Sequence, residues 1–326
     1  MHLVLVYDSN NPRQDAEGSR VIQSFHEDVN QAIIAALQAN GHVVSALEAD
    51  ANLEERLREL KPDFVFNCSN TGQDEGEKSY APRILNKLGI PFTGSGGSAC
   101  YNAYDKERTK RILLAAHIAT PQALVIHNPH HYKIPETLTY PLFVKPVSGG
   151  CSYGIGRNNL IRSQANLNKR IQQIYDQVES PLLVEEFLEG REFTAGILGN
   201  NQPLVLPLME FKYKRDNGAS FRSYQLKMVD YADEEVRCPA ELGPNKLLEV
   251  RRLVQRTYKA IGCRDYARVD VRMDRTGKPY VLEVNALPNL MPKTSSYAIM
   301  AQKAGMNFCE LIRSILRTAA ARYSTV

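Results

Sequence analysis

The first 67 residues alternate between short apolar runs and helical patterns, and this alternation restricts the fold more than any other feature of the chain. Residues 2–7 are mostly apolar, as in a buried strand. The pattern then gives a helix that ends at Asn40-Gly41, a strand that begins at Val43-Val44, a helix over 53–60 and a strand over 63–67. Strands that alternate with helices form parallel sheets with crossover connections. We therefore predict a parallel α/β sheet here.

Further segments with clear periodicity follow along the chain. We expect a turn at residues 94–97 that closes the first region at about residue 100, helices over 106–116, 246–261 and 307–321, strands over 140–146, 182–187 and 193–198, and a hairpin of 267–273 and 280–284 around a turn in 274–277. Residues 212–235 are polar and lack a steady period. A stretch of that length between regular elements indicates a functional lid.

Composition excludes several classes of protein. A chain of 326 residues with 43% hydrophobic and 23% charged residues is typical of a globular enzyme with two domains or several lobes. The net charge of +4 is too small and too dispersed to indicate a nucleic-acid partner. The six cysteines are scattered, which favours a reduced, cytoplasmic protein. Without a leader pattern or an apolar run of ~20 residues, we expect no membrane partner.

The hairpin brings together side chains that suit a metal ion. If residue 270 faces residue 283, Asp270 opposes Glu283 and Arg268 opposes Asn285, all on one face of the sheet. Two opposed carboxylates repel each other unless a cation lies between them. A hard divalent cation takes oxygen ligands, and Asn285 would add a neutral one. An ordinary hairpin whose charges face water is the alternative, and the hairpin alone leaves both interpretations open.

A second chemical signal is Lys145, which directly precedes a Gly-rich turn at residues 148–154. Glycines let backbone N–H groups approach phosphate oxygens, and a lysine supplies a compact positive charge. The order of residues differs from a Walker loop, and the glycines at 94–97 lack the spacing of a dinucleotide fingerprint. A plain turn is the alternative for each stretch. The motifs of zinc hydrolases and of serine hydrolases do not occur.

Taken together and in this order, the segments resemble the ATP-grasp superfamily, and within it the D-alanine–D-alanine ligase-like group. Residues 105–110 with Thr120-Pro121 resemble its lysine-bearing helix, 143–154 its phosphate-covering loop, 183–194 its nucleotide-holding hinge, and 268–270 with 283–285 its metal-binding strands. The resemblance covers nearly the whole chain and is strongest from about residue 105 to residue 311.

The resemblance implies an α/β ATP-grasp fold in three parts. Residues 1–100 would form a Rossmann-like pre-ATP-grasp domain on the substrate side. Residues 101–184 would form the central ATP-grasp lobe. Residues 185–326 would form the C-terminal lobe, which carries the metal site and a mobile lid at about 212–235. ATP would lie between the last two lobes.

The resemblance also assigns residues to the ATP phosphates. Lys106 and Lys145 would contact them directly. Ser152 and the neighbouring Cys151 would close over them from the Gly-rich loop. Lys227 would reach them from the lid.

The nucleoside would be held by the hinge. Glu185 would accept a hydrogen bond from the adenine amino group, and the backbone of Glu186 and Leu188 would contact the edge of the ring. Glu192 would hold the ribose hydroxyls.

The metal ligands would be Asp270, Glu283 and Asn285, with two magnesium ions expected and manganese as an alternative. Arg268 would stabilise the oxyanion that forms when an amine attacks an acyl phosphate. The implied activity is that of an ATP-dependent carboxylate–amine ligase, which forms a C–N bond between amino acids, or between an amino acid and another small molecule. The family also suggests a homodimer. The alternatives are an enzyme that activates a non-amino-acid carboxylate and a non-catalytic nucleotide-binding module.

The substrate side departs from the pattern of D-alanine–D-alanine ligases. Their Gly-Gly-x-Ser-x-Glu and His-Gly motifs are replaced by residues 7–11 and 67–76. Met228 stands where a Tyr follows the lid lysine, and Pro288-Asn289 and Thr294 replace a Pro-Gly and a downstream Ser. The identity and chirality of the acid and of the amine therefore stay open at this point.

Overall fold

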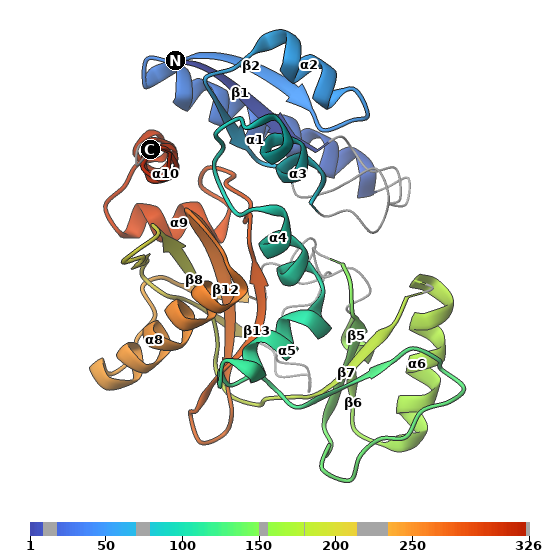
Figure 1. Ribbon diagram of the computed structural model, residues 1–326. Coiled ribbons are helices and arrows are strands. Elements are labelled where there is room, and N and C mark those ends of the chain that lie inside the picture. The colour runs from blue at the N-terminus through green and yellow to red at the C-terminus, as the bar shows by residue number, and fades with distance from the viewer. Residues whose placement is uncertain (9–17, 70–78, 150–155, 179, 214–233, 324–326) are drawn as a thin grey trace.

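The computed structural model describes residues 1–8, 18–69, 79–149, 156–178, 180–213 and 234–323 (Figure 1). In these residues the strands form three sheets, which differ in strand direction and in the helices that cover them. None of the helices described is both long enough and apolar enough to span a bilayer. The five cysteines that fall in this part of the chain are free thiols.

The N-terminal sheet is parallel, as predicted, with strand order β2-β1-β3. Its elements are β1 (His2–Tyr7), α1 (Gly18–Ala39), β2 (Val43–Glu48), α2 (Leu53–Leu60) and β3 (Phe64–Asn67). Alternate residues of β1 serve opposite faces. Leu3 and Leu5 pack with α1, whereas Val4 and Val6 pack with α2. Both faces of the sheet are thus covered, which is the usual condition for parallel strands.

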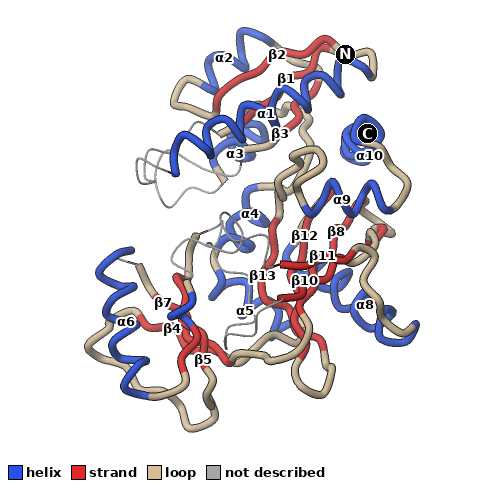
Figure 2. The backbone as a smooth tube through the Cα atoms, turned by 180° about the vertical axis from the view of Figure 1, so that it is seen from behind, coloured by secondary structure: helices blue, strands red, loops and turns tan. Residues whose placement is uncertain are grey.

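The central sheet is antiparallel, with strand order β4-β7-β5-β6. Its elements are β4 (Ala123–Ile126), β5 (Leu142–Pro146), β6 (Leu160–Ile161), α6 (Gln164–Val178) and β7 (Leu182–Glu186). One face packs against α6 through Val144 and Val184 (Figure 2). The other face carries Phe143, Lys145 and Glu185, because paired residues of neighbouring strands share a face.

The C-terminal sheet has strand order β11-β10-β8-β12-β13, with β9 paired to β8. Its elements are β8 (Glu192–Leu198), β9 (Leu204–Val205), β10 (Met209–Tyr213), β11 (Glu234–Arg237), β12 (Tyr266–Met273) and β13 (Pro279–Asn285). Helix α8 (Pro244–Ile261) packs on its apolar face. This sheet holds the predicted hairpin.

The hairpin has the predicted register at its functional end and a different one at its turn. Asp270 pairs with Glu283 and Arg268 with Asn285, as the sequence predicts. Beyond that point Val271 pairs with Val281, so Leu282 is an extra residue that forms a β-bulge. The bulge places Glu283 on the same face as Asp270 while Val281 stays on the buried face.

The remaining helices connect the sheets. They are α3 (Tyr80–Leu88), α4 (Gly97–Tyr104), α5 (Lys106–Ala115), α9 (Ser296–Lys303) and α10 (Phe308–Ala320). Helix α5 lies between the central and C-terminal sheets in both views (Figures 1 and 2) and packs on α8 and β13. Helix α10 packs on α1, so the end of the chain returns to the N-terminal sheet.

A buried carboxylate ties the N-terminal and C-terminal parts together. The side chain of Asp265 is fully buried and accepts hydrogen bonds from the Gly94 amide (2.7 Å), from Asn200 Nδ2 (2.9 Å) and from two nitrogens of Arg322 (2.8 and 2.7 Å). Gly94 has a φ of +88°, and a Cβ there would lie 2.4 Å from a methyl group of Leu287. The predicted turn therefore requires glycine for close packing as well as for its backbone conformation.

Replacing Asp265 with Asn should destabilise the protein by about 3–5 kcal/mol, since it leaves the Arg322 guanidinium next to a neutral group. Asp265 has a φ of +64°, a conformation that Asn also tolerates, so the substitution isolates the charge. The free energy of unfolding in urea measures the loss.

The matched control is Arg58→Met, which breaks the exposed ion pair of Arg58 with Glu54 (2.8 Å) and should cost less than about 1 kcal/mol. Equal losses in the two variants would contradict the role given to Asp265.

Candidate functional site

The polar face of the C-terminal sheet gathers the predicted metal-site residues. Strands β8, β12 and β13 are neighbours, and cross-strand pairs share a face. That face carries Glu192, Thr194, Arg268, Asp270, Arg272, Glu283 and Asn285. Valine side chains at 269 and 271 point to the opposite, apolar face, where α8 packs. The four residues predicted from the hairpin therefore lie together.

Asp270 is held by two neighbours. Arg268 donates to both of its oxygens, from Nε at 3.0 Å and from Nη2 at 2.9 Å, and the Thr194 hydroxyl donates to Oδ1 at 2.5 Å. Burial alone would raise the pKa of Asp270, but the charge and hydrogen bonds of Arg268 and the bond from Thr194 outweigh it and lower the pKa. Asp270 is therefore ionised at neutral pH. Thr194 was not among the predicted site residues.

The donor set around Asp270 suits a hard divalent cation. Glu283 lies beside Asp270 and influences its pKa, and among the described residues the buried Nδ2 of Asn285 has no hydrogen-bond partner. Two carboxylates and one amide are oxygen ligands of the kind that Mg²⁺ takes. The described part of the chain contains no cluster of three or more His, Cys, Asp or Glu residues that could hold a metal. A cation here would therefore also need oxygens from water or from a ligand.

Glu192, predicted to hold a ribose, is fixed by two residues that the sequence patterns did not single out. Arg272 Nη1 lies 2.7 Å from Glu192 Oε2, and the Tyr213 hydroxyl donates to the same oxygen at 2.9 Å. Arg272 is buried, and its guanidinium lies 4.6 Å from the centre of the Phe187 ring. It also donates to the Leu188 carbonyl. Arg272 thus connects the hinge to the polar face of the sheet.

The hinge backbone is partly engaged already. The Glu186 amide donates to the Gln122 carbonyl (2.9 Å), and the Leu188 carbonyl accepts from Arg272. Each peptide unit offers one N–H and one carbonyl. The Glu186 carbonyl and the Leu188 amide are thus the groups through which these two residues could contact a ligand.

The polar face of the central sheet is built around one buried carboxylate. Glu185 is 3% exposed and forms ion pairs with Lys145 and with Lys110, whose Nζ lies 2.8 Å from Oε2. Burial alone would raise the pKa of Glu185, but the two ammonium groups together lower it to about 2. Lys145 and Glu185 were predicted site residues, whereas Lys110 was noted only as part of a motif.

Lys106 lies between the two polar faces. It is the first residue of α5, which is capped by the Asp105 side chain. Its Nζ donates to the carbonyls of Val147 (3.4 Å) and Gly149 (3.2 Å). Burial lowers the pKa of Lys106 to about 8, and Glu283 and Glu185, from different sheets, both counteract the effect. The predicted lysine is therefore close to both sheets.

Three predicted contacts fall outside the described residues. They are those of Cys151 and Ser152 in the Gly-rich loop and of Lys227 in the predicted lid. The ends of the lid predicted over about 212–235 are instead strand: residues 212–213 belong to β10 and 234–235 to β11, and these strands pair in antiparallel fashion. The rest of the predicted lid lies outside the described residues.

The strand order of the N-terminal sheet reverses between β1 and β3. The chain moves from β1 to β2 on one side and then to β3 on the other, and ligands bind at the carboxyl ends of strands where the order reverses in this way. Asp8 and Ser69 meet there, with the Ser69 hydroxyl donating to Asp8. Asn67 is buried and closes a turn through two hydrogen bonds with the Ser69 backbone (both 3.1 Å).

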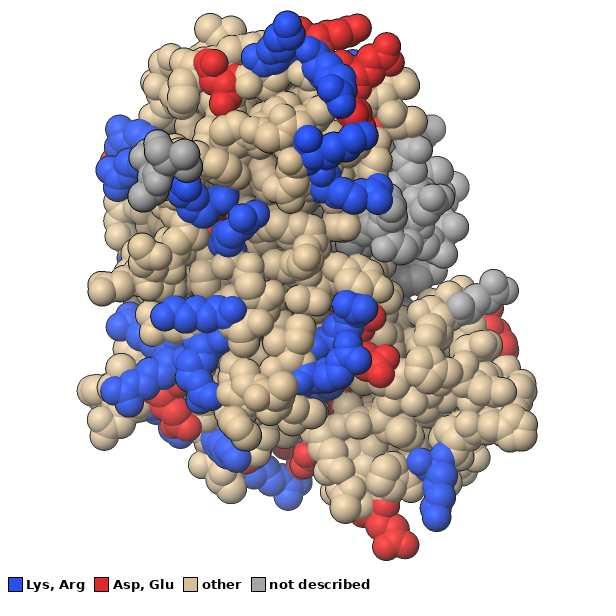
Figure 3. Space-filling model, in the orientation of Figure 1, with Lys and Arg blue, Asp and Glu red and all other residues tan. Residues whose placement is uncertain are grey.

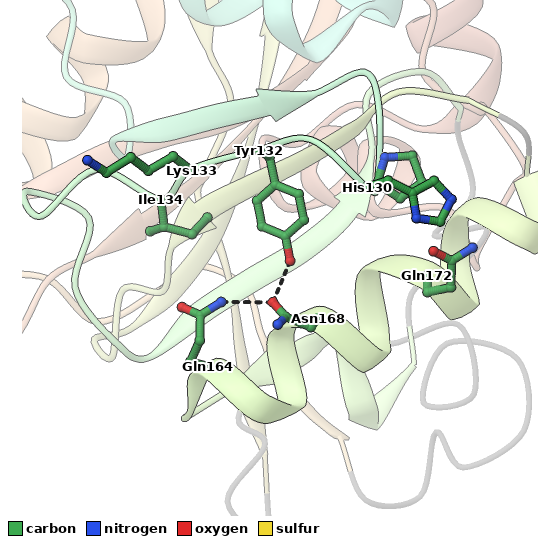
Figure 4. Close-up of a pocket in the computed structure, with 8 residues that line it drawn as sticks. His130, Tyr132, Lys133, Ile134, Gln164, Asn168 and Gln172 are labelled. Atoms are coloured by element: carbon green, nitrogen blue, oxygen red, sulfur yellow. Dashed lines mark hydrogen bonds between the residues drawn. The ribbon is translucent and has the colours of Figure 1, made fainter.

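A polar groove of about 590 Å³ on the central lobe is separate from these residues (Figure 4). Polar side chains of α6 form one wall, and the loop that holds His130 and Tyr132 forms the other. Tyr132 donates to Asn168 at 2.6 Å. The groove contains none of the predicted site residues. On the face of the molecule shown in Figure 3, basic side chains form separate groups with acidic ones among them.

Comparisons with known proteins show which family this chain resembles. Residues 116–317 match the family model described as the D-ala D-ala ligase C-terminus. A D-alanine–D-alanine ligase of Carboxydothermus hydrogenoformans is 36% identical over 293 residues, which cover 87% of this chain and 90% of the relative. An uncharacterized protein of Sinorhizobium fredii is 31% identical over 303 residues, covering 90% and 88% of the two chains.

Two solved structures share the fold. The D-alanine–D-alanine ligase of Bacillus anthracis complexed with ATP superposes with a TM-score of 0.77 at 22% identity, covering 99% of both chains. The VanG D-Ala:D-Ser ligase of Enterococcus faecalis gives a TM-score of 0.75 at 19% identity, covering 98% of this chain and 99% of that one. The fold is therefore the ATP-grasp fold predicted from the sequence. The chain belongs to the D-alanine–D-alanine ligase family of ATP-grasp enzymes and is an ATP-dependent ligase that forms C–N bonds.

Proposed function

We propose that ATP lies between the polar faces of the central and C-terminal sheets, with α5 at the phosphate end. The observation that carries this proposal is the position of Lys106, which is close to Lys145 and Glu185 on one side and to Glu283 on the other. A polyphosphate is the ligand that such an arrangement suits, because it carries enough negative charge to match the lysines and enough oxygens to complete a metal site.

The metal site would consist of Asp270, Glu283 and Asn285, and it would hold two Mg²⁺ ions, with Mn²⁺ as an alternative. A bound ion of this kind would neutralise charge on the transferred phosphoryl group. Arg268 and Thr194 keep Asp270 ionised and oriented for this role. Ser152, Cys151 and Lys227, which lie outside the described residues, would complete the proposed phosphate contacts.

The nucleoside would bind along the hinge. The Glu186 carbonyl and the Leu188 amide offer an acceptor and a donor for the edge of adenine, and Glu185 lies at the end of the same strand. Glu192, fixed by Arg272 and Tyr213, would accept hydrogen bonds from ribose hydroxyls. The stacked rings of Phe143 and Phe187, 6.1 Å apart, provide an apolar wall next to the hinge.

The reaction has two steps. A substrate carboxylate attacks the γ-phosphorus of ATP, which releases ADP and leaves an acyl phosphate with a good leaving group. The amine then attacks the acyl carbon, and phosphate departs with its electron pair. Arg268 donates to both oxygens of Asp270, and we assign it to the oxyanion of the second step because a guanidinium stays charged.

For the substrates, we propose D-alanine as the acid and a D-amino acid as the amine, both held near the carboxyl ends of β1 and β3. Named relatives support this choice, since one is a D-alanine–D-alanine ligase and a structural neighbour joins D-Ala to D-Ser. We also propose that the protein acts in the cytoplasm as a homodimer. The free thiols of the described cysteines are compatible with a reducing compartment.

With ATP and Mg²⁺, phosphate release should depend on added D-alanine and should match the amount of a D-alanyl amide formed. The assay compares D-alanine, D-serine, L-alanine and glycine, singly and in pairs, with products identified by mass spectrometry. Release that depends on none of these amino acids would sink the amino-acid assignment and favour a different carboxylate.

The Glu283→Gln variant should lose at least about 100-fold in kcat while keeping its unfolding transition, because it removes a carboxylate from the proposed metal site without changing the size of the side chain. Glu249→Gln, on the exposed face of α8, is the matched control. Near-normal turnover of Glu283→Gln at saturating Mg²⁺ would refute the metal assignment.

The pH dependence of ATP capture should reflect Lys106. Its charged form binds phosphate, and with a pKa of about 8 in the free enzyme it loses that charge as the pH rises above 8. We therefore expect kcat/KM for ATP to fall above pH 8 in the wild type. In Lys106→Arg the fall should move to higher pH, since arginine stays charged. The substrates titrate in the same way with both enzymes, so a difference between the two pH profiles of kcat/KM comes from residue 106. Superimposable profiles would contradict the assignment of Lys106.

A further inference from the structure

Lys110 differs from its two neighbouring lysines in how its ammonium group is used. The described residues offer it three acceptors: the Thr120 hydroxyl at 3.1 Å, the Pro121 carbonyl at 2.8 Å and Glu185 Oε2 at 2.8 Å. A lysine has three N–H donors. Lys110 is also buried, with 6% exposure. The protein itself thus surrounds this ammonium group with two hydrogen bonds and one close ion pair, in which Glu185 Oε2 forms no hydrogen bond of standard geometry.

Lys106 and Lys145 are arranged differently. Lys106 donates to two carbonyls at 3.2 and 3.4 Å, and Glu185 is the acceptor that the described residues provide for Lys145. Both ammonium groups thus have donor capacity that a phosphate could use. Lys106 and Lys145 are therefore suited to bind a phosphate, whereas Lys110 is suited to hold neighbouring residues in position.

The Thr120 hydroxyl extends the contacts of Lys110 to the metal-bearing hairpin. It accepts from Lys110 and donates its own proton to the Val281 carbonyl at 2.9 Å. The Val281 amide in turn donates to the Ala119 carbonyl at 2.8 Å. Val281 is the residue of β13 just before the bulge, and Glu283 follows two positions later. Segment 119–121 thus holds β13 where the register changes.

We propose that Lys110 is a positioning residue that links the proposed nucleotide contact Glu185 on the central sheet to the proposed metal-bearing strand β13 through Thr120. This inference rests on the proposed function, because it assigns Lys110 a task only if Glu185 and Lys145 contact ATP. The link runs from β7 through α5 to β13, so it fixes the spacing of the two sheets on either side of the nucleotide. Without this link, Glu185 and Glu283 would each remain in their own sheet, but the link would no longer fix the distance between them.

The test measures kcat and KM for ATP, with amino-acid substrates saturating, in Lys110→Met, Thr120→Val and Thr120→Ser. Thr120 contacts neither Glu185 nor, in the proposed function, ATP. We expect KM for ATP to rise about tenfold or more in Lys110→Met and about threefold to tenfold in Thr120→Val, as for the loss of buried hydrogen bonds. Thr120→Ser keeps the hydroxyl and should stay within about twofold of the wild type.

Arg322→Met is the matched control for a merely structural effect. Like Lys110→Met, this variant removes a cationic partner from a buried carboxylate. The carboxylate here is Asp265, which keeps its hydrogen bonds from Gly94 and Asn200. Arg322→Met should lower the unfolding temperature and leave KM for ATP unchanged. If Thr120→Val behaves like Arg322→Met, with lower stability and an unchanged KM, the positioning role is overturned. Because Thr120→Val retains Lys110, this outcome decides the matter even if Lys110→Met fails to fold.

A further variant distinguishes this inference from the proposed function. Lys145→Met should raise KM for ATP by about 100-fold, as expected when a direct phosphate contact is lost. If Lys145→Met leaves KM unchanged, the proposed nucleotide site is wrong. If Lys145→Met raises KM and Thr120→Val does not, the nucleotide site stands and only the link through Lys110 fails.

Discussion

The burial of ionised groups between two sheets is the constraint on which the rest of this structure depends. Glu185 is almost inaccessible to water, and an isolated carboxylate in such a place would be neutralised rather than charged. Two lysines keep it ionised. Those lysines come from α5 and β5, so the ion pairs connect the helix to the central sheet through side chains.

The same principle operates on the facing sheet. Asp270 lies beside Arg268, two positions earlier on β12, and Glu192 of β8 lies beside Arg272, which is on the same face of β12 as Arg268. Asp270 is thus held in its charged state, and Glu192 is paired with a cation, before any ligand arrives. Such a site needs little reorganisation to accept a nucleotide and a cation, which is the form of preorganisation that makes electrostatic catalysis effective.

The parts of the fold that depend on local periodicity could be predicted from the sequence, whereas those that depend on tertiary contacts could not. The parallel N-terminal sheet and the pairing of Asp270 with Glu283 follow from apolar patterns and alternation. Helix α6 is not predicted from the sequence, because polar residues dominate the segment between Leu167, Ile171 and Ile174 although these three have helical spacing. The roles of Thr194, Arg272 and Lys110 depend on strand neighbours distant in sequence, which a single sequence does not reveal. The bulge is reflected in the spacing of two valines in the sequence. Val281 and Val284 are both buried, although strict alternation would place residues three positions apart on opposite faces.

That bulge has a consequence for how the hairpin can change in evolution. Residues 274–278 form its turn, and length changes there would alter only the exposed end of the hairpin. Pairing Leu282 in a regular ladder would instead make alternation continue from Val281 through Leu282, and Glu283 would then face α8, which would place an acid in the core. The hairpin therefore combines a tip that is free to vary in length with a base in which the bulge at Leu282 decides which side of the sheet Glu283 faces. Descendants of this chain can be expected to differ in the tip and to share the count of residues from the bulge to Asn285.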